Sequence, residues 1–94
     1  MHERALMEDV MRELEAVARE SGAQRITRVH VLLGALSHFT PEHFGEHFED
    51  AARGTVAEGA AVDALVDESL AGERAQGVVI ASVEVVVPDR LEVH

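Results

Sequence analysis

The residues of this chain that could do chemistry are its six histidines and its many carboxylates. Neutral imidazole is the commonest metal ligand among protein side chains. The chain contains no cysteine, which excludes disulfides, thiolate zinc sites, iron–sulfur ligation and cysteine nucleophiles. Any metal ion must therefore bind through nitrogen and oxygen. The histidines are His2, His30, His38, His43, His47 and His94.

The first candidate metal site is the N-terminal sequence Met1-His2-Glu3. The α-amino group, the first backbone amide nitrogen and the His2 imidazole can close fused chelate rings around one ion. Nitrogen-rich tetragonal coordination suits Ni(II) or Cu(II), whereas zinc prefers a tetrahedral set. Copper has at least as high an intrinsic affinity, so selectivity for nickel would depend on supply and delivery. The alternative interpretation is that the histidine is there by chance and the terminus is frayed.

The second candidate site is the stretch "EHFGEHFED", in which His43 and His47 stand four residues apart. On a helix this spacing puts both imidazoles on one face, about one turn apart. The stretch is not the metalloprotease motif, which needs a glutamate directly after the first histidine. A solvated helix face opposite Phe44 and Phe48 is the simpler interpretation. A third hypothesis, metal buffering through His38, His43 and His47, predicts more than one ion per chain. Carboxylates near the pair are Glu42, Glu46, Glu49 and Asp50.

Catalytic motifs are otherwise missing from the sequence. No glycine-rich loop has Walker spacing, and no serine stands in a glycine-flanked elbow. Ser37 and His38 are sequence neighbours, so they point apart and make a poor nucleophile and base. We therefore expect a protein that is not an enzyme.

Length, composition and charge limit the remaining classes. The chain has 94 residues, 47% of them apolar, which predicts one small globular domain over residues 1–94. Its 18 acidic and 8 basic residues give a net charge of −10, which disfavours nucleic acid and anionic membranes as partners. No apolar run is long enough to span a bilayer, and no secretory signal pattern is present. We expect a cytoplasmic protein.

Hydrophobic periodicity predicts two helices. Apolar residues at helical spacing run from Arg4 to Ser21, and Gly22 is a typical helix stop. A second helix should begin at Pro41, after Thr40 as its N-cap, and end near residue 53. Phe39 and Phe44 stand at the two positions of a hydrophobic staple.

Three segments favour strands. "RITRVHVLLG" (25–34) alternates, with Thr27, Val29, Val31 and Leu33 expected on one face. "VVIASVEVVV" (78–87) has the strongest β signal and should be central in the sheet, ending before Pro88. Residues 54–71 fit a helix or a strand, and we interpret them as a strand. The predicted fold is α+β, with two helices packed on one face of a three-stranded sheet. Its strand edges could also pair between copies, giving a homo-oligomer.

Several stretches, in this order, resemble the HypA/HybF family of nickel metallochaperones for hydrogenase and urease maturation. They are "MHERAL", "ITRVHVLLGALS", "PEHFGEHFE", "RGTVAEGA" and "VVIASVEVV". The resemblance implies a nickel-binding domain in which the Met1 amine, His2 and its backbone amide hold Ni(II), with Glu3 as a partner of the site. It also implies delivery of nickel to hydrogenase or urease maturation proteins.

The sequence departs from the family pattern in two places. The family carries a cysteine-rich zinc module between its last two strands, whereas here "DESLAGERAQG" (67–77) holds no cysteine, so no zinc is expected. The family commonly has an acidic residue before the proline of the second helix, and this chain has Thr40. The alternative function is therefore an interaction module that has kept the fold, lost metal delivery and acts as a protein-binding adaptor.

Overall fold

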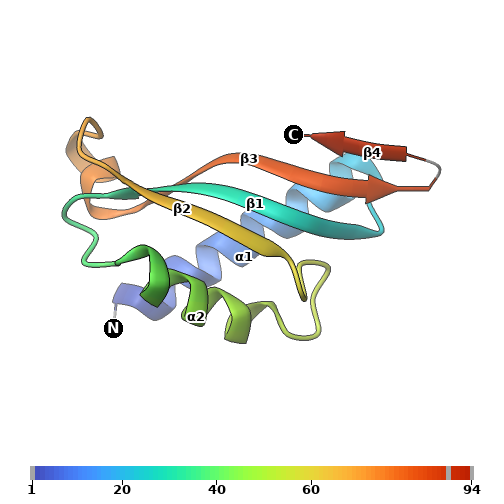
Figure 1. Cartoon of the computed structure of the whole chain (residues 1–94), viewed down its shortest axis with the longest axis horizontal. Coiled ribbons are helices and arrows are strands. Elements are labelled where there is room, and N and C mark those ends of the chain that lie inside the picture. The colour runs from blue at the N-terminus through green and yellow to red at the C-terminus, as the bar shows by residue number, and fades with distance from the viewer. Residues whose placement is uncertain (1, 89, 94) are drawn as a thin grey trace.

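A computed structural model of the chain describes residues 2–88 and 90–93. The chain folds as an α+β domain with two α-helices against a mixed sheet (Figure 1), which confirms the predicted fold class. No helix in the described ranges is both long enough and apolar enough to cross a bilayer. The elements are α1 (His2–Ser21), β1 (Arg25–Gly34), α2 (Pro41–Ala52), β2 (Ala61–Asp67), the 3-10 helix η1 (Gly72–Gln76), β3 (Val78–Val87) and β4 (Arg90–Val93).

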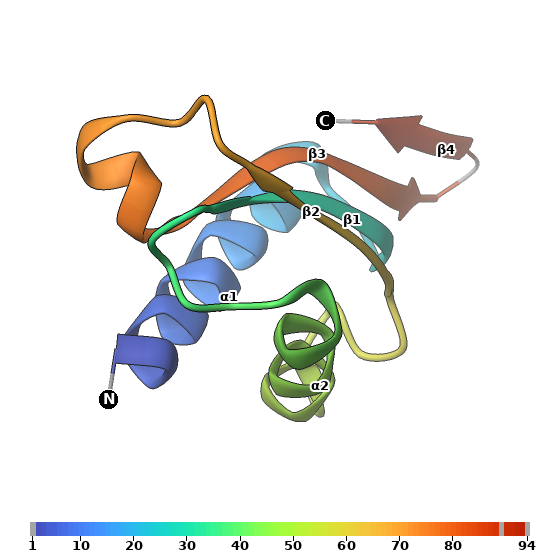
Figure 2. The ribbon, with the colours of Figure 1, turned by 60° about the vertical axis from the view of Figure 1, so that its left-hand side comes forward.

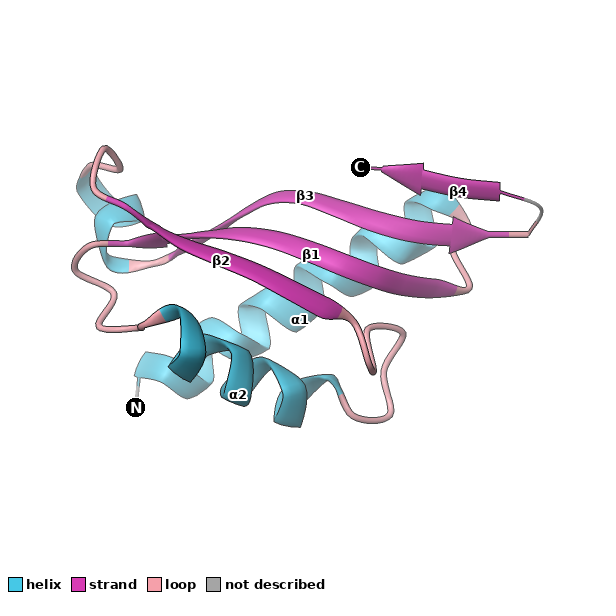
Figure 3. Ribbon diagram, viewed as in Figure 1, coloured by secondary structure: helices cyan, strands magenta, loops and turns pink. Residues whose placement is uncertain are grey.

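The strand order across the sheet is β2-β1-β3-β4. β1 and β2 are parallel and are joined by a crossover through α2, whereas β3 runs antiparallel to β1. The three predicted strands are all present, and β3 is an inner strand as expected. A fourth, short strand, β4, adds to the outer edge of β3 and was not predicted (Figure 3), because four residues carry too little pattern to indicate a strand.

Helix α1 presents an apolar stripe to the sheet, as its periodicity predicts. Met7, Val10, Leu14 and Ala18 are buried along its length. The helix ends at Ser21, and Gly22 adopts a φ of 71°, which allows the Ala23 N–H to donate to the Ala18 carbonyl at 2.9 Å. This left-handed glycine ending is a common way to close a helix.

Both helices lie on the same face of the sheet, side by side (Figure 2). The core between the layers contains Phe44 and Phe48 of α2, Leu14 of α1 and the inward residues of β1 and β3. The two helices therefore approach each other because each must bury its apolar stripe against one shared surface.

The alternation along β1 breaks at one point. Val29, Val31 and Leu33 are buried as predicted, but Ile26 is fully buried and Thr27 is only half-buried. A register shift between residues 26 and 28 opposite β3 explains the difference, since a bulge reverses which residues face the core. The expectation that Thr27 shares the face of Val29 was therefore wrong.

The ambiguous segment 54–71 holds a strand, but a shorter one than its length suggests. Turns occupy residues 53–59, and β2 covers only Ala61–Asp67. The connection that follows contains η1, which packs its backbone against Gly34 at the exit of β1. This contact fixes the path of the chain from β1 toward α2.

Candidate metal centre

The start of α2 fixes the positions of His43 and His47. The Thr40 hydroxyl accepts a hydrogen bond from the His43 backbone N–H at 3.1 Å, and Pro41 occupies the first turn. Phe39 packs edge-on against Phe44, with ring centroids 5.4 Å apart. The predicted N-cap and hydrophobic staple are both confirmed. Because the first turn is fixed at residue 41, the faces of all later residues on α2 are fixed as well.

The two imidazoles stack along one face of α2, as their spacing predicts. Their ring centroids lie 4.7 Å apart with a tilt of 54° between the rings. His43 is exposed and His47 is half-buried. This face is therefore not simply the solvated side of the helix, because His47 turns toward α1.

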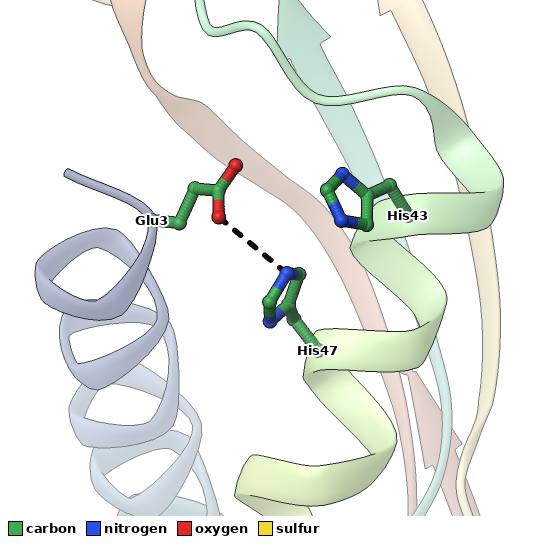
Figure 4. A group of neighbouring side chains, drawn as sticks. All are labelled: Glu3, His43 and His47. Carbon is green, nitrogen blue, oxygen red and sulfur yellow. Dashed lines mark ion pairs between the residues drawn. The ribbon is translucent and has the colours of Figure 1, made fainter. Parts of the chain in front are cut away.

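Glu3, in the first turn of α1, faces the same imidazoles. Its Oε1 lies 3.5 Å from Nε2 of His47, and its side chain is 38% exposed. Figure 4 shows the carboxylate and the two rings pointing toward one another across the space between the helices. Glu3 is four residues before the buried Met7, so it lies on the stripe of α1 that faces inward.

Together, Glu3, His43 and His47 form a group with the composition of a metal site. One possible ligand atom from each residue lies within 4.8 Å of the other two. Within the described part of the chain, no other set of three histidine or carboxylate side chains lies close enough together to share an ion. The sequence pattern predicts the N-terminal residues and the histidine pair as separate candidates, and it contains no signal that Glu3 reaches His47.

Phe39 forms an apolar wall behind both rings. Its ring centroid is 6.5 Å from that of His43 and 6.2 Å from that of His47, and both contacts are edge-on. Phe39 is itself only 4% exposed. A buried wall limits the directions in which the imidazoles can turn, so both rings keep facing the gap between the helices.

A groove continues from this group along the line where α1 meets α2. Its floor is apolar, formed by Met7, Met11 and Ala51, and its rim carries charged side chains of both signs. Glu3 and His47 stand at one end of the groove. The group is therefore open to solvent on the side away from Phe39.

The other predicted site residues lie elsewhere or outside the described part of the chain. Met1 is outside the described residues, and of His2 only the backbone is described, as the first residue of α1. His38 is exposed, has a φ of 67° and belongs to a different surface depression. It does not join the group of Glu3, His43 and His47.

His30 takes part in an ion-pair network on the sheet and not in a metal group. Its Nδ1 lies 3.3 Å from Asp63 and its Nε2 lies 3.5 Å from Glu84. Arg28 also contacts Asp63, at 2.8 Å. The two carboxylates meet opposite nitrogens of the ring, so they cannot share one ion with it. The network instead ties β2, β1 and β3 together.

Comparison with known proteins gives consistent matches to one family. A family model described as hydrogenase/urease nickel incorporation, metallochaperone, hypA, matches residues 1–73. The match includes both candidate ligand sets and ends before β3 begins. The description is that of a metallochaperone, which agrees with the prediction that the chain is not an enzyme.

Individual relatives carry the same name. Hydrogenase maturation factor HypA of Chlorobium limicola is 41% identical over 63 residues, covering 67% of this chain and 54% of that protein. The Methylocella silvestris protein of that name is 40% identical over 63 residues, covering 67% and 56%. The one from Archaeoglobus fulgidus is 35% identical over 69 residues, covering 73% and 63%. The matched region thus spans a little more than half of each relative.

Proposed function

Because the chain belongs to the HypA family of hydrogenase and urease nickel-incorporation metallochaperones, we propose that it holds Ni(II) at its N-terminus. The ligands are the α-amino group of Met1, the backbone nitrogen of His2 and the His2 imidazole, with Glu3 as the neighbouring carboxylate. The bound nickel is then passed to a maturation partner of a metalloenzyme. The observation that carries the proposal is the family match, which begins at residue 1 and so includes Met1-His2-Glu3.

The position of His2 at the start of α1 favours such a chelate. The first four N–H groups of a helix have no acceptor within the helix. The His2 amide can therefore lose its proton to a metal ion without breaking a helical hydrogen bond. The positive end of the helix dipole opposes a cation at this point, and the Glu3 carboxylate in the first turn offsets that field.

The donor set favours nickel over zinc on geometric grounds. An amine, a deprotonated amide and an imidazole on two adjacent residues can lie close to a plane around one ion, which suits Ni(II) or Cu(II). Ligands at a chain terminus exchange readily between proteins, because a terminus is held by few contacts. A metal carrier needs this combination of a preferred geometry and a removable ion.

The partners that follow from the family are hydrogenase or urease maturation proteins, and the site of action is the cytoplasm. The chain spans only part of its relatives' length. We therefore propose nickel delivery and the choice of partner for this chain. The segment 67–77, which stands where the family carries its zinc module, begins with the last residue of β2, continues through a turn and η1, and contains no cysteine. Delivery by this chain would therefore not use a thiolate zinc module of its own.

Calorimetric titration of Ni(II) tests the terminal site. The tag-free chain should bind one ion at its terminus with release of the amide proton, which makes the observed heat depend on the buffer. Acetylation of the α-amino group, which removes it as a donor, or His2→Ala should abolish this proton-linked binding at the terminus, whereas the control His38→Asn should keep it. Equal proton-linked binding by the acetylated and native chains would contradict the proposal.

Delivery needs a second assay. The Ni(II)-loaded chain is mixed with purified hydrogenase or urease maturation proteins, and nickel is measured in each protein after gel filtration. Direct transfer predicts that nickel reaches the partner faster than it is lost to a small chelator that reports free dissociation. Transfer no faster than this loss would contradict a delivery role.

A further inference from the structure

We propose that Glu3, His43 and His47 form a second metal site, which binds one divalent first-row transition ion between α1 and α2. The site is built from described residues of two helices (Figure 4) and does not depend on the amine chelate at the terminus. Two of its ligands, His43 and His47, are absent from the proposed terminal site. The two proposals can therefore fail separately.

The distances are close to those that an ion requires. Two ligand atoms that bind one ion tetrahedrally, each at about 2.0 Å, lie about 3.3 Å from each other. Nε2 of His47 and Oε1 of Glu3 are already 3.5 Å apart. The widest separation in the group, at most 4.8 Å, must shrink by about 1.5 Å to reach the tetrahedral spacing. His43 is exposed, so rotation of its side chain can supply this change without moving α2.

The donor set selects a class of ion. Two imidazole nitrogens with one carboxylate oxygen suit Zn(II), Ni(II), Co(II) or Fe(II), whereas Mg(II) and Ca(II) prefer oxygen ligands alone. Three protein ligands leave at least one coordination position for water or for a ligand from another molecule. Two of the three ligands, Glu3 and His47, also line the groove along α1 and α2. An ion bound there is accessible to exchange and is not enclosed as a structural ion would be.

The scaffold holds helix α2, which carries two of the ligands, in place before any ion binds. The Thr40 cap and the Phe39 staple fix α2 from its first turn. Phe39 also backs both imidazoles, which reduces the orientations that an ion must select. Because the ligands come from both helices, a bound ion links α1 to α2. Metal should therefore raise the melting temperature of the folded chain.

The test uses the full chain with its α-amino group acetylated, which removes the amine chelate and leaves the second site intact. Co(II) and Ni(II) are titrated separately, with the visible absorption of Co(II) and calorimetry as readouts. We expect one ion per chain with a Kd of about 10 μM or tighter. Co(II) should raise the melting temperature, and its absorption should show that imidazole nitrogen is bound.

Three single variants and one double variant identify the ligands. His43→Ala, His47→Ala and Glu3→Gln should each weaken binding by at least about tenfold, and the double histidine variant should lose the Co(II) spectrum. His38→Asn is the matched control, because it removes an exposed histidine outside the group and keeps a residue that tolerates a positive φ. The ligand side chains are at least partly exposed, so the metal-free variants should melt close to the parent chain.

Several outcomes would overturn the proposal. Binding weaker than about 1 mM would be that of an ordinary exposed histidine pair. Unchanged binding after Glu3→Gln would exclude the two-helix site, and equal losses in His38→Asn and His47→Ala would show non-specific histidine binding. A double variant that binds like the parent chain would place the ion elsewhere.

Discussion

Replacement of Gly34 by alanine should destabilise the chain through one added methyl group. A Cβ at this position would overlap the backbone carbonyl of Ala75 and the carbonyl oxygen of Arg74. Both contacts are to the backbone of η1, so no side chain can rotate out of the way. The overlap must be relieved by moving η1 away from β1 or by straining the exit of the strand.

The structure gives the size of the effect for either route. Moving η1 breaks two hydrogen bonds, from Gly34 N–H to the Gly77 carbonyl at 2.9 Å and from Leu36 N–H to the Ala75 carbonyl at 2.7 Å. At a net value of about 1 kcal/mol each, their loss costs about 2 kcal/mol. Keeping η1 in place costs about 1–3 kcal/mol of packing strain. Both routes predict that the free energy of unfolding falls by about 2 kcal/mol.

Gly45 provides a control of opposite sign. It lies inside α2, and a Cβ built there would meet nothing within 4 Å. Gly45→Ala should therefore raise the free energy of unfolding by about 0.5–1 kcal/mol, because glycine loses more backbone entropy in a helix than alanine.

Urea unfolding followed by circular dichroism measures both changes. For a domain of this size, Gly34→Ala should also lower the melting temperature by about 8–16 °C. The reasoning would be refuted if Gly34→Ala changed the free energy of unfolding by less than about 0.5 kcal/mol. It would also be refuted if both substitutions shifted the unfolding midpoint in the same direction.

Two further predictions concern the hydrogen bonds made by Thr40 and by Ser69. Thr40→Ala removes the hydroxyl that accepts from His43 N–H, so the free energy of unfolding should fall by about 1 kcal/mol in urea unfolding, while Thr40→Ser should stay close to the parent chain. Ser69 donates two hydrogen bonds to the Asp67 carboxylate, and both lower the pKa of Asp67. The bond from the Ser69 hydroxyl has the larger effect and the bond from its backbone N–H the smaller. Ser69→Ala should therefore raise that pKa toward its ordinary value in an NMR titration, and an unchanged pKa would contradict this cause. A lowered carboxyl pKa favours folding above the ordinary pKa, and this contribution disappears as pH falls through the lowered value.

Local signals predicted the elements that position the site. Thr40, Pro41 and the pair of Phe39 and Phe44 defined the start of α2 within six consecutive positions, because capping and stapling act between near neighbours. The stripe of α1 and its end at Gly22 were equally local. The strand signals of β1 and β3 were strong for the same reason, since period-two alternation is written in adjacent residues.

Features that depend on distant partners were predicted less well. The bounds of β2 depend on β1, with which it pairs in parallel from Arg28 to Gly34, and its own residues fit helical and strand periods alike. β4 is a strand because it pairs with the end of β3. The bulge near Thr27 likewise exists only in the pairing of β1 with β3.

The sequence alone determined which ligands the chain has and how they are spaced. It excluded thiolate sites, put His43 and His47 on one helix face, and joined the amine, amide and imidazole of Met1-His2 by covalent bonds. Only the tertiary structure decided that Glu3 lies 3.5 Å from His47. That distance is set by the packing of α1 and α2 on one face of the sheet, where residues 44 positions apart meet because both helices bury their apolar stripes in the same core.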